Sequence, residues 1–167
     1  MRVRLEHWGP GDLALLEGLV GDPAMMEHLG GPESLEKIRE RQTRYEGTDT
    51  AFKVVDEDSG DGVGWVGYWK HDGAWEIGWA VLPEHQGRGV ASAATQQALD
   101  RARVDGRYRF VHAFPDVHNT PSNAICRKLG FTLLGVEDGE YPKGHPRRFN
   151  NWRYDLSAED ARPRTGP

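Results

Sequence analysis

The residues best suited to chemistry form the segment Gln86–Ala91, which reads QGRGVA and stands between an expected strand and an expected helix. Gly87 and Gly89 allow a tight turn that brings backbone N–H groups close to an anion. The N-terminus of the following helix adds free donors and the positive end of its dipole. Arg88 can add a full positive charge. This segment therefore predicts a site for a phosphate-bearing ligand.

Three phosphate-binding motifs can be compared with this segment. A P-loop requires Gly-Lys-Ser/Thr, which the segment lacks. A dinucleotide fingerprint requires a third glycine where Ser92 stands, and a parallel βαβ unit that the preceding hairpins do not provide. The third pattern, Q-x-x-G-x-A, is met by Gln86, Gly89 and Ala91. A glycine-rich turn that merely caps a helix is the alternative interpretation.

Two further segments, in the right order, extend the third pattern. Glu76–Gln86 reads EIGWAVLPEHQ, and Asn119–Phe131 holds Asn119, Ser122 and a Lys-Leu-Gly-Phe ending. Together they resemble the GNAT superfamily of N-acetyltransferases, whose Q-x-x-G-x-A loop binds the pyrophosphate of acetyl-CoA. Asp22–Met26, Leu29-Gly30 and Val63–Gly67 resemble the branch related to ribosomal-protein N-acetyltransferases. The resemblance extends from about Arg2 to Leu156.

This resemblance implies where acetyl-CoA would bind. The pantetheine arm would lie along the strand end, the pyrophosphate on the loop amides, and the thioester end near the start of the later helix. The cofactor-binding residues that it implies are Ala80, Val81, Leu82, Gln86, Gly87, Arg88, Gly89, Val90, Ala91, Ser92, Asn119, Ser122 and Lys128.

Acyl transfer to an amine requires a base for the amine and a proton for the leaving thiolate. Glu76 is the candidate base, because period-2 alternation places it beside Gly78 and Ala80, where a substrate has room. A salt-bridged or substrate-binding glutamate is the alternative. The opposite face of the same strand would carry Trp75, Ile77, Trp79 and Val81.

The proton donor is less clearly marked. Many GNAT enzymes have a tyrosine five residues before the Phe of the terminal Gly-Phe, and here that position is Cys126. A thiol, with a reference pKa of ~8.5, could protonate a thiolate. Cysteine is also a common small buried hydrophobe. Ser122 or solvent is therefore the alternative acid.

The acceptor site is expected from the first half of the chain and the late hairpin. Aromatic faces with carboxylates nearby suit a cationic or aromatic amine, although ordinary sheet packing also explains such aromatics. We expect transfer to a small-molecule primary amine by direct attack in a ternary complex; a protein N-terminus, or a catalytically idle acyl-CoA-binding module, is the alternative. The residues proposed to bind the acceptor are Glu27, His28, Trp65, Trp69, Glu76 and Tyr141.

The elements that must position these residues follow from hydrophobic periodicity and turn signals. They predict an α/β fold with a mixed, mostly antiparallel sheet, and the resemblance implies a V-shaped split in it. Strands are expected over residues 2–8, 51–56, 63–70, 75–82, 108–114, 131–136 and 149–156. Helices are expected from Leu13, capped by Asp12, and over residues 23–29, 35–45, 90–104 and 120–129.

Composition and charge limit the classes of protein to which the chain can belong. The chain has 167 residues and a net charge of −5, with −8 in residues 1–83 and +3 in residues 84–167. This balance excludes a strongly basic nucleic-acid binder and fits a polyanionic cofactor on the second half and an amine on the first. The lone Cys126 allows no internal disulfide, and no His or Cys spacing indicates a metal. No apolar segment suggests a membrane span or a secretory signal, so we expect a cytoplasmic protein. We expect one domain over residues 1–156 and a disordered tail over residues 157–167. A homodimer is possible.

Overall fold

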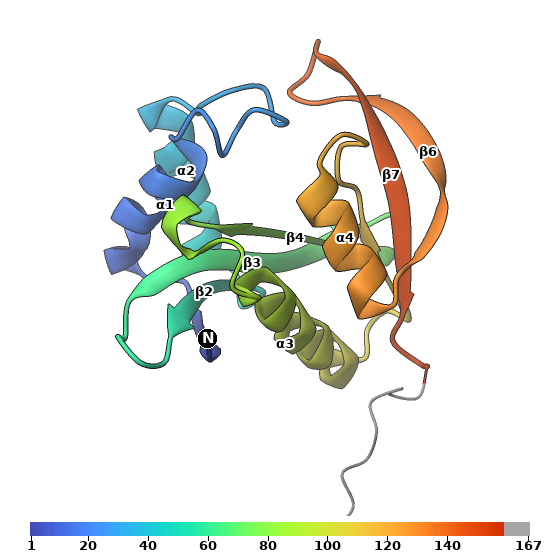
Figure 1. Cartoon of the computed structure of the whole chain (residues 1–167), viewed down its shortest axis with the longest axis horizontal. Helices are drawn as coiled ribbons and strands as arrows, with labels where there is room; N and C mark the ends of the chain where they lie inside the picture. Colours follow the sequence, from blue (N-terminus) through green and yellow to red (C-terminus); the bar gives the residue numbers. More distant parts are fainter. Residues whose placement is uncertain (159–167) are drawn as a thin grey trace, which may run out of the picture.

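A computed structural model describes residues 1–158, which fold around one seven-stranded mixed sheet (Figure 1). The strand order is β1-β2-β3-β4-β5-β7-β6. The strands are β1 (Val3–His7), β2 (Ala51–Asp56), β3 (Gly62–His71), β4 (Ala74–Val81), β5 (Phe110–Ala113), β6 (Thr132–Glu140) and β7 (Pro146–Asp155). The helices are α1 (Leu13–Val20), α2 (Leu35–Glu46), α3 (Val90–Asp105) and α4 (Thr120–Leu129), with short 3-10 turns η1 (Pro10–Asp12) and η2 (Pro83–His85).

The sheet consists of two antiparallel parts joined by a short parallel contact. β1 to β4 form an antiparallel meander, and β5, β7 and β6 form a second antiparallel group. β4 and β5 are parallel, and their register covers only Trp75 with Val111 and Glu76 with His112. Beyond Glu76 the two strands separate. The predicted α/β class and the V-shaped split are thus confirmed.

Helices cover both faces of the sheet (Figure 1). The small side chains Ala94, Ala98 and Ala102 let α3 approach β1, β3 and β4 closely, and all three are buried in the larger core. On the other face, α1 and α2 enclose a smaller core that includes Leu16 and Ile38. Ser34 caps α2 by accepting a hydrogen bond from the backbone N–H of Lys37.

The segment between α1 and α2 differs from its prediction. Residues 23–29 form consecutive turns rather than a helix, and Asp22 stabilises the first turn by accepting a hydrogen bond from the N–H of Met25. Pro23 excludes one backbone donor, and the two glycines at 30 and 31 adopt the left-handed conformation that ends the turns. Figure 1 shows this loop reaching toward the tip of the β6–β7 hairpin. Gly30 packs so closely on Pro142 that a Cβ there would lie 2.3 Å from its Cδ.

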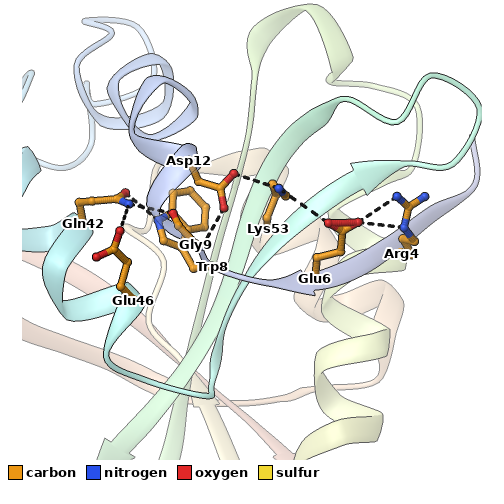
Figure 2. Close-up of polar contacts among 8 residues, drawn as sticks. All are labelled: Arg4, Glu6, Trp8, Gly9, Asp12, Gln42, Glu46 and Lys53. Carbon is orange, nitrogen blue, oxygen red and sulfur yellow. Dashed lines mark hydrogen bonds and ion pairs between the residues drawn. The ribbon is translucent and has the colours of Figure 1, made fainter.

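Asp12 also differs from its predicted role as the cap of α1 (Figure 2). Its carboxylate accepts hydrogen bonds from the Gly9 N–H at 2.8 Å and from Lys53 Nζ at 2.9 Å, and accepts none from the N–H groups of α1. Lys53 projects from β2, so this contact ties the entry of α1 to the sheet. Gln42 of α2 adds a second tie by accepting a 2.7 Å hydrogen bond from the Trp8 indole.

The late hairpin is longer than its sequence pattern indicated. β6 continues to Glu140 and β7 begins at Pro146, whereas alternation marked only the segments 131–136 and 149–156. Every residue of β6 is exposed, so hydrophobic patterning could not mark its extension. Of the predicted tail, residues 157 and 158 form a turn, and residues 159–167 lie outside the described part of the chain. Within residues 1–158, no helix has the length and hydrophobicity needed to cross a membrane.

Candidate active site

A cavity of about 610 Å³ lies where β4 and β5 separate. It is lined by the α1–α2 loop, the end of β4, the loop before α3, one side of α4 and Tyr141 near the tip of the late hairpin. Segments from the whole length of the chain therefore meet at this one place.

The loop before α3 has the backbone geometry that the sequence predicts for an anion site. Gly87 and Gly89 have φ values of 75° and 78°, in the left-handed region that favours glycine. Gly89 caps α3, and its carbonyl accepts the first helical hydrogen bond from the N–H of Ala93. The N–H groups of Val90, Ala91 and Ser92 thus have no partner within the helix, and all three residues line the cavity. These donors suit the pyrophosphate of a coenzyme A molecule.

Gln86 holds this loop against the sheet. Its side-chain Nε2 donates a 2.9 Å hydrogen bond to the Val81 carbonyl and lies 3.3 Å from Met25 Sδ. The glutamine of the Q-x-x-G-x-A pattern therefore links the end of β4, the anion loop and the α1–α2 loop. This contact gives Gln86 a positioning role beside its predicted contact with the cofactor.

The edge of β4 is the second part of the site that suits an extended ligand. After Glu76 it has no β5 partner in the described register, and Trp79, Ala80 and Val81 line the cavity. An extended chain with amide groups, such as pantetheine, can pair with an open strand edge. Leu82 and Arg88, both predicted to contact the cofactor, are absent from the cavity lining that the described residues form. Arg88 is exposed to solvent.

The N-terminus of α4 provides the other wall. Asn119 caps this helix, its Oδ1 accepting a 3.2 Å hydrogen bond from the N–H of Ser122. Asn119, Ser122 and Lys128, which the sequence analysis names as candidate cofactor-binding residues, all line the cavity.

A buried side chain that sequence reasoning missed fixes this helix. Asn123 donates from Nδ2 to the carbonyls of Asp116 and Asn119, and its Oδ1 accepts from Asn150 Nδ2 and Trp152 Nε1, both at 2.8 Å. It ties α4 to β7 and to the turn before the helix. An asparagine one residue after Ser122 carries no pattern that would reveal this network, because its partners are distant in sequence.

Glu76 lies at the apex of the split, in the last register pair of β4 with β5. Its side chain is 23% exposed, and its Oε1 lies 3.9 Å from Nδ1 of His71. Burial raises the pKa of Glu76 above that of an ordinary glutamate, and the nearby His71 partly opposes this shift. A carboxylate with a raised pKa is suited to taking a proton from an amine. Glu76 itself is absent from the lining of the described cavity.

Cys126 is placed unfavourably for the acid role considered for it. It is completely buried in the core on the inner side of α4 and does not contribute to the described cavity wall. Burial raises the pKa of its thiol to about 12. The small-hydrophobe interpretation fits this position, and Ser122 on the cavity side of α4 is the better placed hydroxyl.

The proposed acceptor residues separate into two groups. Glu27, His28, Trp65 and Tyr141 line the cavity, and Glu27 contacts His28 at 3.1 Å. Trp69 instead lines a neighbouring cavity of about 380 Å³. Trp65 is stacked on Tyr45 with ring centroids 5.1 Å apart and on Trp69 at 6.4 Å. Trp65 therefore packs against two aromatic rings, whereas Trp69 remains 40% exposed.

Two residues that the sequence did not mark also line the main cavity. Arg41 of α2 is paired with Glu33 and donates a 3.1 Å hydrogen bond to the Tyr45 hydroxyl. His85 of η2 lines the cavity with a buried Nδ1 that has no partner among the described residues. No group of three or more metal-ligating side chains occurs within residues 1–158.

Comparisons with known proteins agree with this geometry. Two curated relatives are the uncharacterised N-acetyltransferase YnaD of Bacillus subtilis (strain 168), 29% identical over 96 residues, and the uncharacterised N-acetyltransferase p20 of Bacillus licheniformis, 29% identical over 103 residues. These matches cover 56% and 59% of this chain, and span only 56% and 58% of the length of the two relatives.

Solved structures share the fold over almost the whole chain. A GNAT-family acetyltransferase from Bacillus anthracis has a TM-score of 0.84 at 21% identity, covering 95% of this chain and 97% of its own. Spermidine N-acetyltransferase from Vibrio cholerae, in complex with CoA and spermine, has a TM-score of 0.79 at 21% identity, covering 93% and 96%. A ribosomal-protein-alanine N-acetyltransferase from Brucella melitensis has a TM-score of 0.75 at 19% identity, covering 93% and 99%.

The family follows from a match to the sequence itself. The family model described as the acetyltransferase (GNAT) domain matches residues 2–132, which include the strand edge, the anion loop and the start of α4. The chain therefore belongs to the GNAT acetyltransferase family.

Proposed function

We propose that this chain transfers an acetyl group from acetyl-CoA to the primary amine of a small molecule, by direct attack in a ternary complex. The observation that carries the proposal is the single cavity in which free α3 amides and an open β4 edge meet, just beyond Glu76. Residues 1–156 are proposed as one acetyltransferase domain, because strands from both halves of the chain share one sheet.

Acetyl-CoA would supply an activated acetyl thioester. Gly87, Gly89, Val90, Ala91 and Ser92 would hold its pyrophosphate through backbone N–H groups, with Arg88 adding charge from the exposed loop. Ala80 and Val81, with Leu82 beyond them, would pair with its extended arm along β4, while Gln86 keeps the loop in place. Asn119, Ser122 and Lys128 would contact it from α4.

Glu76 is proposed as the general base. Burial keeps its carboxylate poorly hydrated and raises its pKa, so that it accepts a proton from an ammonium group more readily than an exposed glutamate does. Ser122 or water would return a proton to the departing thiolate. The fully buried Cys126 is not proposed for that role.

A small amine is supported by the charge and shape of the acceptor side. Glu27, His28, Trp65 and Tyr141 line the cavity opposite α4, and the first half of the chain carries the net −8 charge. The spermidine N-acetyltransferase with the same fold acts on an amine of this kind. A protein N-terminus is the second candidate, since the fold is also shared by a ribosomal-protein-alanine N-acetyltransferase.

The proposal is tested by steady-state release of CoA from acetyl-CoA over a panel of polyamines, aromatic amines, amino acids and N-terminal peptides. Turnover with a small amine and a strong loss in Glu76→Gln are expected. Turnover restricted to peptides would establish the second candidate. Tight CoA binding with no acceptor, and no effect of Glu76→Gln on that binding, would identify an idle acyl-CoA-binding module.

A thermal-shift series distinguishes a protein that binds acetyl-CoA from a nucleotide-binding domain. Stabilisation by CoA and not by NAD or ATP is expected, because ligands that bind the native state raise its apparent stability. Stabilisation by NAD or ATP alone would overturn the proposal. Homodimer formation and cytoplasmic location remain predictions, which sedimentation and fractionation would test.

A further inference from the structure

His71 lies beside Glu76 and is more exposed to solvent than Glu76 is. His71 ends β3 and lies with its Nδ1 3.9 Å from Oε1 of Glu76. The side chain of Glu76 is 23% exposed and that of His71 is 50% exposed. The half-exposed ring thus stands between a shielded carboxylate and water. The distance exceeds a hydrogen bond, so a small rotation of the ring is needed to close it.

The β3–β4 turn fixes the other side of this ring. His71 pairs with Ala74 across a two-residue turn in which Asp72 and Gly73 have φ values of 47° and 74°. Two successive positive φ values are typical of the tight turn that joins antiparallel strands. This turn places Asp72 Oδ2 3.4 Å from His71 Nε2, with the Asp72 side chain 92% exposed. Carboxylates therefore face both ring nitrogens, one shielded and one in solvent.

The neighbouring strand keeps the ring at the apex of the split. Phe114 packs edge-on against His71, with ring centroids 6.0 Å apart, and is stacked on His112 at 5.7 Å. The titratable groups around His71 are thus Asp72 and Glu76 in direct contact, and His112 on the far side of Phe114. His112 is engaged elsewhere through a 2.7 Å hydrogen bond between its Nδ1 and Asn151 Oδ1.

The proposed reaction must release one proton to solvent. An ammonium substrate and acetyl-CoA give an amide, CoA with a neutral thiol, and one H⁺. Glu76 can hold that proton after the N–H bond of the ammonium group breaks and an O–H bond forms. Glu76 must be a carboxylate again before the next turnover. Because its side chain is only 23% exposed, a more exposed base beside it would speed the loss of this proton.

We propose that His71 is a relay residue that carries this proton from Glu76 to solvent. The O–H bond of Glu76 breaks as an N–H bond forms at Nδ1 of His71, and Nε2 of the imidazolium gives up its proton to Asp72 or water. The ring ends neutral as its Nδ1–H tautomer, and proton exchange with water returns it to the Nε2–H tautomer before the next turnover. Glu76 ends ionised, so atoms and charge balance over the whole cycle. This inference rests on the proposed function and names a residue that acts through Glu76.

The test compares His71→Gln with His7→Gln, a matched change at an exposed histidine on the edge strand β1. With the amine found for the wild type, His71→Gln should lower kcat about tenfold at unchanged KM. This is less than the ~100-fold or more expected for a group that takes the proton from the substrate, because His71 acts through Glu76. Added imidazole should restore most of the loss. His71→Gln should have no further effect in a Glu76→Gln background, and thermal unfolding would check that each variant is folded.

Each outcome has one meaning. Failure of the folded wild type to acetylate any amine would overturn the proposed function and the relay with it. Turnover by the wild type with an equal kcat in His71→Gln would overturn the relay alone. A pH profile displaced to higher pH, with an unchanged plateau and no imidazole rescue, would show that His71 only tunes the charge of Glu76, and would also overturn the relay.

Discussion

Glu76 of β4 lies directly opposite His112 of β5, in the last register pair before the two strands separate. In a parallel pair, residues in register project from the same face of the sheet. The proposed base therefore stands at the apex of the split, where a backbone that is still paired holds it rigidly. The neighbouring β4 edge, one residue further, is free to receive a ligand.

Replacing Glu76 by Gln should lower kcat by about 100-fold or more, as removal of a general base does. Because burial raises the pKa of Glu76, the wild-type kcat/KM should increase with pH through a midpoint above the usual glutamate range. The variant should lack this increase. Continuous assays of CoA release would measure kcat at a saturating amine concentration, and kcat/KM at amine concentrations well below KM. A variant with wild-type kcat would contradict the assignment of Glu76 as base.

The same substitution should stabilise the protein at neutral pH. A carboxyl group whose pKa is raised by folding favours the native state below the unfolded-state pKa, and this stability is lost as pH rises through the folded-state pKa. Glu76→Gln removes the ionisable carboxyl group and, with it, this loss of stability. Urea unfolding should give similar free energies for the two proteins in acid and a higher free energy for the variant at neutral pH. The prediction would be contradicted if the free energy of unfolding of the variant, measured relative to that of the wild type, were lower at neutral pH than in acid.

Gly89→Ala should weaken acetyl-CoA binding through the backbone. Gly89 has a φ of 78° with nothing within 4 Å of a built Cβ, so the substitution causes backbone strain, about 1–2 kcal/mol, rather than a clash. A loop that relaxes this strain moves the amides of Val90 and Ala91. We expect the KM for acetyl-CoA to rise several-fold more than kcat falls, in steady-state assays.

Gly60→Ala is the matched control for this change. Gly60 has a φ of 80° and equally open surroundings, but it lies in the β2–β3 turn away from the cavity. It should lose similar stability in urea unfolding and keep the wild-type KM. An equal KM increase in both variants would mean that general destabilisation, rather than the anion loop, causes the effect.

The sequence predicts the parts of this molecule whose signals are local. The anion loop depends on two left-handed glycines and a helix start, and alternation along β4 correctly separates Glu76 from Trp75 and Ile77. Residues 23–29 form turns instead of the expected helix, and Gly30 at their end packs on Pro142, a residue that the local apolar pattern could not mark. Asn123 could not be predicted, since its contacts with Asn150 and Trp152 depend on which elements become neighbours, and the same holds for the packing of Phe114 on His71.

Replacing Cys126 by Ala should leave kcat within about twofold of wild type and lower stability by about 1–3 kcal/mol, as losses of buried atoms do. The side chain is fully buried and out of reach of reagents, and burial raises the pKa of its thiol to about 12, which disfavours release of its proton. A thiol reagent should therefore label native protein slowly and unfolded protein quickly. A hundredfold loss of kcat in a folded Cys126→Ala variant would restore the acid role for this thiol.

Asn123→Ala should be the most destabilising of these changes, by about 2–4 kcal/mol in urea unfolding. The substitution removes hydrogen bonds to Asp116 and Asn119 and leaves the buried Trp152 indole N–H without a partner, each costing about 1 kcal/mol or more. Because the same side chain holds the turn that ends at Asn119, the KM for acetyl-CoA should also rise. Asn150→Ala is the control, since it removes only the hydrogen bond from half-buried Asn150 to Asn123 Oδ1 and should cost about 1 kcal/mol. Equal losses in the two variants would show that the network does not act through Asn123.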